Sequence, residues 1–332
     1  MTIRVAINGF GRIGRTVLRA ALTRGDWPQI EIVAINDIAD AESCAYLFEY
    51  DSVFGVYPGA VALEPGALMV DGRRIRLTHE ADLSRCALSD VDLVMECTGK
   101  ADSREVAARG LAAGAGTVLI SGPSAAAEFT LVLGANEAGL RPDQRIVSNA
   151  SCTTNALAPV ARLIDAHWGI ETAHMTTIHC YTGSQPTIDA PRGAPARSRA
   201  AALSMVPTTS SAQRLTDEVL PGLAGRIRCA AVRVPTASVS AIDMTVVTRE
   251  APQVDAVNDV FRRAGGVIGW TERPLVSSDL RARPESVIMA LPETTVTDGG
   301  LMRVFGWYDN EWGFSCRMLD AAGRVGPQAG QS

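Results

Sequence analysis

The chain has 332 residues, of which 47% are hydrophobic and 20% are charged. This balance is typical of a folded globular protein, and the length is sufficient for two domains that each bury a core. The formal net charge of −5 provides no basic field for nucleic acid or for an anionic membrane surface. No stretch approaches the roughly 18 uninterrupted apolar residues of a membrane span. We therefore expect neither nucleic-acid nor membrane partners.

The seven cysteines are scattered and form no C-x-x-C pair, which favours reduced thiols over a disulfide framework. The first residues form a strand pattern at once, without the apolar stretch of a signal peptide. These features together predict a cytoplasmic protein. No group of histidine, cysteine and carboxylate residues has the spacing of metal ligands, so no metal site is expected.

Strand and helix patterns alternate through the first half of the chain. Apolar strands are expected at residues 3–8, 30–36, 91–97, 117–121, 129–133 and 146–148, with helices at 16–22 and 103–113. Apolar strands separated by helices are typical of a parallel sheet that is covered on both faces. The pattern predicts an α/β domain over residues 1–150, with a doubly wound parallel sheet of the Rossmann type.

The second half has a different pattern. Strands are expected at 174–181, 228–234, 239–247, 286–291 and 301–307, and a helix is expected at 254–264. This pattern predicts an α+β domain over residues 151–311, with a mixed, largely antiparallel sheet and helices on one side. Residues 183–211 read as a long irregular loop, which is usually functional in a compact domain. We expect the C-terminal helix, within 312–332, to pack back onto the first domain.

A glycine-rich turn follows the first strand. Gly9, Gly11 and Gly14 stand in a G-x-G-x-x-G pattern between a strand and a helix, where glycines permit a tight turn and close approach of a pyrophosphate. Asp37 ends the next strand, 23 residues after Gly14. A carboxylate there accepts hydrogen bonds from ribose hydroxyls and repels a 2′-phosphate. The pattern therefore predicts NAD as cofactor.

Two further loops follow strands of the expected parallel sheet. Thr98-Gly99 and Ser121-Gly122 each come directly after an apolar strand. The loops at the carboxyl ends of such strands line the ligand crevice of a doubly wound sheet. Each dipeptide alone also fits an ordinary turn.

Cys152 lies where a strand ends and a helical pattern begins, within Ser-Cys-Thr-Thr-Asn. A thiol at a helix N-terminus faces unpaired N–H groups and the positive end of the helix dipole, which favour the thiolate. The hydroxyl and amide side chains around it do not suit an apolar core. We therefore predict that Cys152 is a nucleophile that ionises more easily than a free cysteine.

A cysteine nucleophile needs a neighbouring base. Of the four histidines, His174 and His179 lie five residues apart on an alternating strand, so their side chains point to opposite faces. The sequence favours His179 slightly as the base, and either ring also fits a hydrogen-bonded core histidine.

Arg233 stands among apolar residues near the end of a strand. A guanidinium in such a place is costly unless it pairs with an anion. A structural ion pair would meet this need. So would a phosphate pocket formed with nearby hydroxyl residues, namely Thr153, Thr182, Ser210 and Ser211.

The chain resembles the phosphorylating glyceraldehyde-3-phosphate dehydrogenases along essentially its whole length. The matching segments are INGFGRIGR at 7–15, AIND at 34–37, YDSVFG at 50–55, SNASCTTN at 148–155, HCYTG at 179–183, RVPT at 233–236 and WYDNEWGFS at 307–315. The segment around Cys152 and the Asn-Glu-Trp-Gly segment are together highly specific for that family.

The resemblance implies roles for individual residues. It implies Cys152 as nucleophile and His179 as its partner base. The residues that it implies for contact with NAD are Arg12, Ile13, Asp37, Ser121 and Asn310, and those that it implies for substrate phosphate and inorganic phosphate are Ser151, Thr153, Thr182 and Arg233. It also implies that the 183–211 segment reaches the cofactor site across a subunit interface in a homotetramer.

The implied activity is that of a glycolytic enzyme. Glyceraldehyde 3-phosphate, phosphate and NAD would give 1,3-bisphosphoglycerate and NADH through a cysteine thioester. One alternative is erythrose-4-phosphate dehydrogenase, a relative with similar cofactor chemistry. An alternative from another class is a non-catalytic NAD-binding regulatory protein. A third, a cysteine acyl hydrolase, would have no use for the dinucleotide turn.

Overall fold

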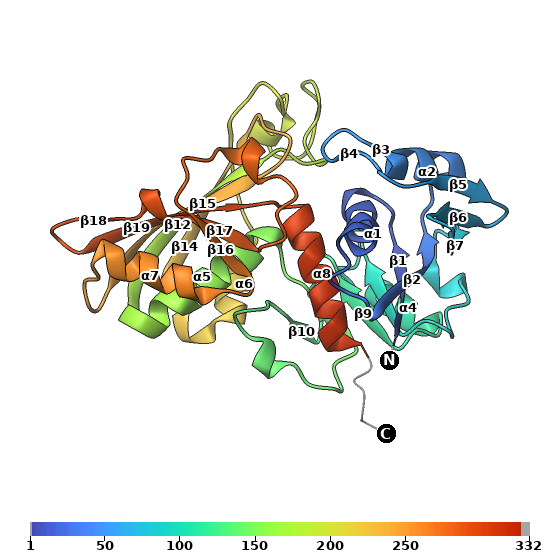
Figure 1. The fold of residues 1–332 in the computed structure, drawn as a ribbon, viewed down its shortest axis with the longest axis horizontal. Coiled ribbons are helices and arrows are strands. Elements are labelled where there is room, and N and C mark those ends of the chain that lie inside the picture. The colour runs from blue at the N-terminus through green and yellow to red at the C-terminus, as the bar shows by residue number, and fades with distance from the viewer. Residues whose placement is uncertain (1, 327–332) are drawn as a thin grey trace. The chain divides into compact units, whose positions relative to one another are not determined.

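A computed structural model describes residues 2–326 and divides them into two compact units (Figure 1). Unit 1 takes residues up to 131, 138–150 and those from 315 onward; unit 2 takes 132–137 and 151–314. Helix α8, Trp312–Val325, contributes residues to both units. The final part of the expected C-terminal helix, 327–332, lies outside the described residues.

Unit 1 contains a sheet of nine strands in the order β10-β11-β9-β8-β1-β2-β7-β6-β5. Every neighbouring pair from β10 to β7 is parallel, whereas β6 and β5 are antiparallel to their neighbours. The doubly wound sheet is thus confirmed, with an antiparallel edge that the sequence did not predict. Its strands are β1 Ile3–Asn8, β2 Ile30–Asn36, β5 Val61–Glu64, β6 Ala67–Val70, β7 Arg73–Thr78, β8 Leu93–Glu96, β9 Thr117–Ile120, β10 Phe129–Thr130 and β11 Ile146–Ser148.

The helices of unit 1 are α1 Arg12–Arg24, α2 Ala41–Glu49, α3 Arg104–Ala107 and α4 Arg109–Ala112, and a small hairpin joins β3 Tyr50–Asp51 to β4 Gly55–Val56. The expectation of one continuous helix over 103–113 is wrong, because it breaks at Ala108 into α3 and α4. After the break Gly110 lies tightly on the sheet. A Cβ at Gly110 would lie 2.8 Å from Val118 Cγ2, so only glycine permits this close packing.

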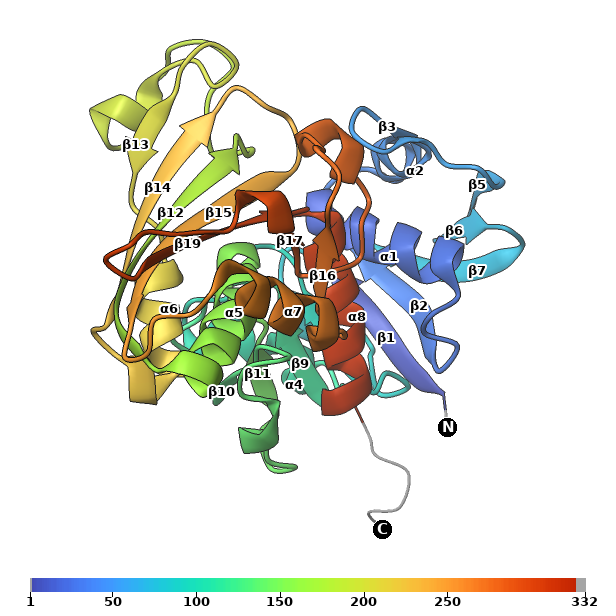
Figure 2. The same cartoon turned by 60° about the vertical axis from the view of Figure 1, so that its left-hand side comes forward.

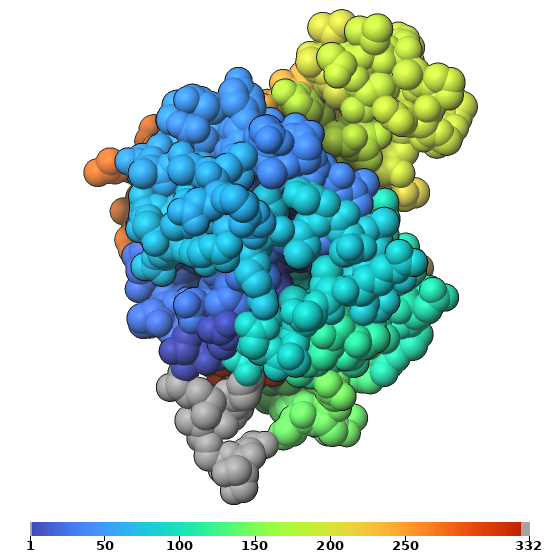
Figure 3. Space-filling view, turned by 90° about the vertical axis from the view of Figure 1, so that its right-hand side faces the viewer, coloured from blue at the N-terminus to red at the C-terminus, as the bar shows by residue number. Residues whose placement is uncertain are grey.

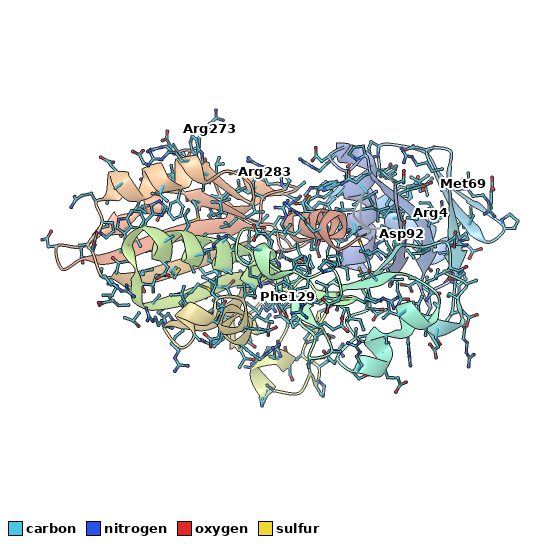
Figure 4. The ribbon with its side chains drawn as sticks, turned by 90° about the horizontal axis from the view of Figure 1, so that it is seen from below. Arg4, Met69, Asp92, Phe129, Arg273 and Arg283 are labelled. Carbon is cyan, nitrogen blue, oxygen red and sulfur yellow. The ribbon has the colours of Figure 1, made fainter. Side chains whose placement is uncertain are left out.

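The amino ends of the parallel strands are joined by structural hydrogen bonds, whereas the carboxyl ends are where a ligand crevice is expected. At the amino ends, the backbone N–H of Arg4 on β1 donates to the carboxylate of Asp92, the residue before β8, at 2.7 Å. Both residues are labelled in Figure 4. In the sheet, β1 lies between β8 and β2. The chain passes from β1 to β2 on one side and later returns to β8 on the other side, so the connections diverge at the carboxyl end of β1. Ligand crevices form at such a switch point, which is where the sequence places the glycine turn.

Unit 2 contains a mixed sheet in the order β13-β14-β12-β15-β19-β17-β16, with β18 added beside β19. Helices α5, α6 and α7 cover one face of it (Figure 2). The bounds are α5 Cys152–Trp168, β12 Ile170–Cys180, β13 Val206–Thr208, α6 Ala212–Val219, β14 Ile227–Val234, β15 Ser240–Thr248, α7 Val254–Ala264, β16 Ile268–Thr271, β17 Val287–Ala290, β18 Thr295–Val296 and β19 Leu301–Tyr308. The largely antiparallel α+β arrangement expected from the sequence is confirmed.

Residues 183–211 form a loop with a short 3-10 helix, Pro195–Ser198, and the strand β13. They appear as the yellow-green lobe in Figure 3. Three large apolar side chains on this segment are exposed: Ile188, Leu203 and Met205. The sequence missed β13 and α6. Each is short, so neither shows enough turns or alternations for a period to be recognised.

Within residues 2–326, no helix is both long enough and apolar enough to cross a membrane.

Candidate active site

The start of α5 presents Cys152. Strand β11 ends at Ser148, and Ala150 then adopts φ 54°, a left-handed conformation that is uncommon for a residue with a Cβ and is often found at functional sites. Ser151 caps the helix, because its Oγ accepts the backbone N–H of Thr154 at 3.1 Å. Cys152 is therefore the first residue of α5, in the position expected from the sequence.

The thiol of Cys152 lies beside His179. Its Sγ is 3.6 Å from His179 Nε2, within the distance of a sulfur hydrogen bond. His179 is 6% exposed and lies near the end of β12 on the buried face. His174 is exposed on the opposite face of the same strand. The structure thus brings His179, and not His174, to the thiol.

The other ring nitrogen of His179 has two neighbours. Nδ1 is 2.7 Å from the carbonyl oxygen of Cys180 and 2.6 Å from Nη1 of Arg233. When Nδ1 carries the proton it donates to the carbonyl, and Nε2 then offers a lone pair to the thiol. When Nδ1 accepts from Arg233, Nε2 carries the proton and donates to the sulfur. The first tautomer keeps the hydrogen bond to the Cys180 carbonyl and suits taking the thiol proton. The second keeps the hydrogen bond from Arg233 and suits holding a thiolate.

Burial controls the charge of both groups. Burial raises the pKa of the Cys152 thiol. The Arg233 charge and the Thr153 N–H lower this pKa, but their effect is smaller than that of burial. Burial, together with the Arg233 charge, lowers the pKa of His179 to about 4. The expectation that Cys152 ionises easily is therefore wrong for this structure, because desolvation outweighs the helix terminus. Because Sγ lies within hydrogen-bond distance of Nε2, we expect the thiolate to form by proton transfer from Cys152 to His179.

Tyr308, at the end of β19, was not predicted as a site residue. Its hydroxyl lies 2.9 Å from Thr153 Oγ1 and 2.7 Å from Thr177 Oγ1. Its ring packs edge-on against His179, with centroids 5.9 Å apart. Tyr308 thus joins the first turn of α5 to β12, the two elements that carry the thiol and the imidazole. Only its place in the WYDNEWGFS segment could have indicated this role.

Arg233 has no acidic partner. Within residues 2–326, no carboxylate oxygen lies within 4.0 Å of its guanidinium, and Nη1 instead donates to the Cys180 carbonyl at 3.0 Å. The alternative of a structural ion pair, left open by the sequence, therefore does not hold. A partly buried cation without a carboxylate partner, next to the thiol–imidazole pair, suits an anionic ligand.

The other residues predicted for unit 2 lie on nearby segments with local partners. Thr182 Oγ1 lies 3.0 Å from Ser184 Oγ, and Ser210 Oγ accepts the Ala212 N–H at 3.1 Å. Ser211 precedes α6 and makes no side-chain cap bond. Asn310 is 7% exposed, and its Oδ1 accepts from Cys180 Sγ at 3.0 Å.

Unit 1 contains a cavity of about 370 Å³ at the carboxyl ends of its strands. Four residues predicted from the sequence line it: Gly9, Gly11, Asp37 and Thr98. One oxygen of the Asp37 carboxylate accepts the Phe10 N–H at 2.5 Å, which joins the glycine turn to β2. Of the residues predicted for the cofactor within unit 1, five do not line this cavity, namely Arg12, Ile13, Gly14, Gly99 and Ser121. Arg12, for example, forms an ion pair with Asp51.

The glycines of the turn have separate roles, which predicts separate effects of substitution. A Cβ at Gly14 would lie 2.2 Å from the Gly9 carbonyl oxygen, whereas a Cβ at Gly11 would meet nothing within 4 Å. We expect Gly14→Ala to lower the free energy of unfolding by about 1–3 kcal/mol. Gly11 lines the cavity, and a methyl group there would meet no protein atom. Gly11→Ala should therefore keep its stability, and we expect it to lose dinucleotide affinity because the turn would no longer permit close approach of a pyrophosphate.

Denaturant unfolding and isothermal titration calorimetry measure the two effects. Equal losses of stability in both variants would contradict these roles, and so would unchanged dinucleotide affinity in Gly11→Ala.

No group of three or more potential metal ligands occurs among the described residues.

Comparison with known proteins finds matches both for the part of the chain that contains the glycine turn and for the part that contains Cys152 and His179. Residues 3–104 match the family "Glyceraldehyde 3-phosphate dehydrogenase, NAD binding domain", and residues 151–310 match "Glyceraldehyde 3-phosphate dehydrogenase, C-terminal domain". Proteins named glyceraldehyde-3-phosphate dehydrogenase are similar over nearly the whole chain. The one from Pseudomonas aeruginosa is 49% identical over 328 residues, covering 97% of this chain and 98% of that protein. The one from Xanthobacter flavus is 46% identical over 334 residues, covering 98% and 99%.

Both parts of the chain thus match the two domains of one family. The first part contains the cavity with the glycine turn and Asp37, and the second contains the thiol–imidazole pair. The chain belongs to the glyceraldehyde-3-phosphate dehydrogenase family and is an oxidoreductase that uses NAD as its cofactor.

Proposed function

We propose that the protein oxidises glyceraldehyde 3-phosphate to an acyl phosphate, with inorganic phosphate as second substrate, through a thioester on Cys152. The observation that carries this proposal is the row of Cys152, His179 and Arg233, in which Sγ lies 3.6 Å from Nε2 and Nδ1 lies 2.6 Å from the guanidinium. It offers a nucleophile, a base and a cation side by side. Oxidation of a phosphate-bearing aldehyde to a thioester uses all three: the nucleophile, the base and a cation for the phosphate.

The first step is attack on the aldehyde. His179 takes the thiol proton at Nε2, and the sulfur of Cys152 bonds to the carbonyl carbon to give a hemithioacetal. The new oxyanion forms close to the start of α5, whose N–H groups stabilise negative charge. His179 then donates its proton to this oxygen. Because the imidazole has a low pKa in the buried site, it returns the proton readily.

The second step is oxidation to the thioester. NAD, which Gly9, Gly11 and Asp37 would hold in the cavity of unit 1, would supply the acceptor for the hydride of the hemithioacetal carbon. His179 takes the hydroxyl proton as the carbonyl re-forms, which leaves a thioester on Cys152. An oxygen of inorganic phosphate then attacks the thioester carbon, and the phosphate hydroxyl proton passes to water. The Cys152 sulfur leaves as a thiolate and takes back the proton that His179 holds, and the acyl phosphate is released. Neutral imidazole is the form needed to accept a proton, and the lowered pKa of His179 keeps it in that form at neutral pH.

The two phosphates of the proposed reaction need hydrogen-bond donors as well as a positive charge. Arg233 provides the charge, and we propose that Ser151, Thr153, Thr182, Ser210 and Ser211 provide hydrogen-bond donors. Thr153 already has Tyr308 as a partner, which fixes its side chain before substrate arrives. A fixed donor loses less entropy on binding than a free one.

An absorbance assay tests the proposed reaction. We expect NADH to form with glyceraldehyde 3-phosphate at many turnovers per site when phosphate is present, and at no more than one per site when phosphate is absent. Without phosphate the thioester has no second substrate, so the enzyme stops after one turnover. Equal steady rates with and without phosphate would contradict the acyl phosphate. A higher kcat/KM for erythrose 4-phosphate than for glyceraldehyde 3-phosphate would identify erythrose 4-phosphate as the preferred substrate. The proposed thioester mechanism would be unchanged.

We also propose that the protein works as a homotetramer in the cytoplasm. The apolar side chains Ile188, Leu203 and Met205 are more than 70% exposed on the 183–211 segment. Several large apolar side chains exposed on one segment are typical of a surface that another subunit covers. Light scattering should give about four times the 35.1 kDa chain mass. A monomeric mass would exclude this proposal.

A further inference from the structure

The cavity of unit 1 has an unusual charge balance for a site that takes an anionic dinucleotide. Five charged side chains line it: the carboxylates Asp37, Glu80 and Glu96 and the cations Lys100 and Arg109. Carboxylates thus outnumber cations. The phosphates of NAD are negatively charged, and the net negative charge of the lining repels them. Binding of the adenylate half therefore needs a cation that faces a phosphate.

Of the two cations, Arg109 already has acidic partners. Its guanidinium lies 3.4 Å from Asp82 and 3.5 Å from Glu105. Lys100 has none, because no carboxylate oxygen of residues 2–326 lies within 4.0 Å of its ammonium. Among the described residues that line the cavity, Lys100 is therefore the cation that remains available to a ligand. It is also the only lysine of the chain.

The backbone of Lys100 is held in place. Gly99 adopts φ +69°, and the Lys100 N–H donates to Thr98 Oγ1 at 3.2 Å. The backbone N–H and the hydroxyl of Thr98 in turn donate to the buried carboxylate of Glu96. Glu96 also accepts from the Asn8 side chain, which fixes β8 to β1. The lysine side chain thus extends from a fixed turn at the wall of the cavity.

We propose that the Lys100 ammonium binds the phosphate-bearing adenylate half of the dinucleotide and decides how well the site tolerates a 2′-phosphate. Gly9 and Gly11, which suit a pyrophosphate, and Asp37, which suits the ribose, line the same cavity. Asp37 repels a 2′-phosphate, and the nearby ammonium offsets part of this repulsion. Lys100 therefore acts on the affinity for NAD and more strongly on the affinity for NADP.

Binding measurements on the full-length protein test the first part of the proposal. Lys100→Gln should raise the Kd of NAD about tenfold, which corresponds to about 1.4 kcal/mol, and the Kd of NADP by a larger factor. Lys100→Arg should keep both values within about threefold, because it keeps the charge. The effect of Lys100→Gln should shrink at about 0.5 M salt, since salt screens a partly exposed charge.

A matched control removes a cation elsewhere on unit 1. Arg141 is exposed before β11 and its guanidinium pairs with Asp143, so Arg141→Gln changes the net charge equally without touching the cavity. We expect its Kd values to match those of the wild type. An unchanged Kd of NAD in Lys100→Gln would overturn the proposal, and so would an equal loss in Arg141→Gln, because it would indicate an effect of net charge alone.

Chemical labelling of the unaltered protein gives an independent test. A water-soluble N-hydroxysuccinimide acetate reacts with amines, and Lys100 is the only side-chain amine in the chain, so peptide mass spectrometry reports its reactivity directly. ADP-ribose and NAD should slow its acetylation strongly, and adenosine at equal occupancy should slow it less, because adenosine has no phosphate. Equal rates with and without NAD would overturn the proposal. Equal protection by adenosine would overturn the phosphate contact.

Discussion

Replacing Cys152 with alanine is expected to reduce turnover by about 10⁴-fold or more, since removal of a nucleophile leaves only binding and oxyanion stabilisation. NAD should still bind with wild-type affinity, because the cavity with the glycine turn belongs to unit 1 and Cys152 belongs to unit 2. Steady-state NADH formation measures the first effect, and calorimetric titration with NAD measures the second.

A second cysteine variant serves as the control. Cys229 is a partly buried thiol on β14 in the same unit, packed against the core. Cys229→Ala should keep the activity within a small factor, since this thiol has no role in the mechanism. If Cys152→Ala retained more than a few per cent of wild-type turnover, Cys152 would not be the nucleophile.

Replacing His179 with asparagine is expected to reduce kcat by about 10²- to 10⁴-fold, which is the usual contribution of a general acid or base. Alkylation of Cys152 by iodoacetamide should also slow at neutral pH. Burial raises the pKa of this thiol, so without the imidazole as proton acceptor the thiolate forms only at alkaline pH. The pH dependence of the alkylation rate measures the shift. The midpoint in the variant should lie above that of the wild type.

His174 provides a matched control, because it lies on the same strand with its side chain exposed on the other face. His174→Asn should leave both kcat and the alkylation profile unchanged. An unshifted alkylation midpoint in His179→Asn would mean that Cys152 ionises without help from the imidazole. The helix terminus would then be the main source of its reactivity, as the sequence alone had indicated.

The sequence predicted the elements whose patterns are long and regular. The apolar strands of unit 1 alternate with helices, and the structure confirms the doubly wound sheet that this alternation predicts. Helix α7 has the bounds expected from its period. The position of Cys152 at the start of a helix also follows from local sequence, because a strand pattern, a capping serine and an apolar period occur in succession.

Other features depend on contacts between distant segments and could not be predicted. The Tyr308 hydroxyl forms hydrogen bonds with Thr153 and Thr177, which precede it in the chain by 155 and 131 positions. The choice of His179 over His174 depends on which face of β12 packs against α5. The pKa direction of Cys152 depends on burial that no local pattern reveals. In each case the chemistry depends on what surrounds a side chain, and a single sequence gives little information about surroundings.

The most direct measurement concerns the covalent intermediate. The enzyme is mixed with NAD and glyceraldehyde 3-phosphate without inorganic phosphate, and the reaction is stopped with acid after one turnover. Peptide mass spectrometry should then find the 3-phosphoglyceroyl group on Cys152, in an amount equal to the NADH formed. NADH formed in that amount with an unmodified Cys152, or with the acyl group on another residue, would contradict the account.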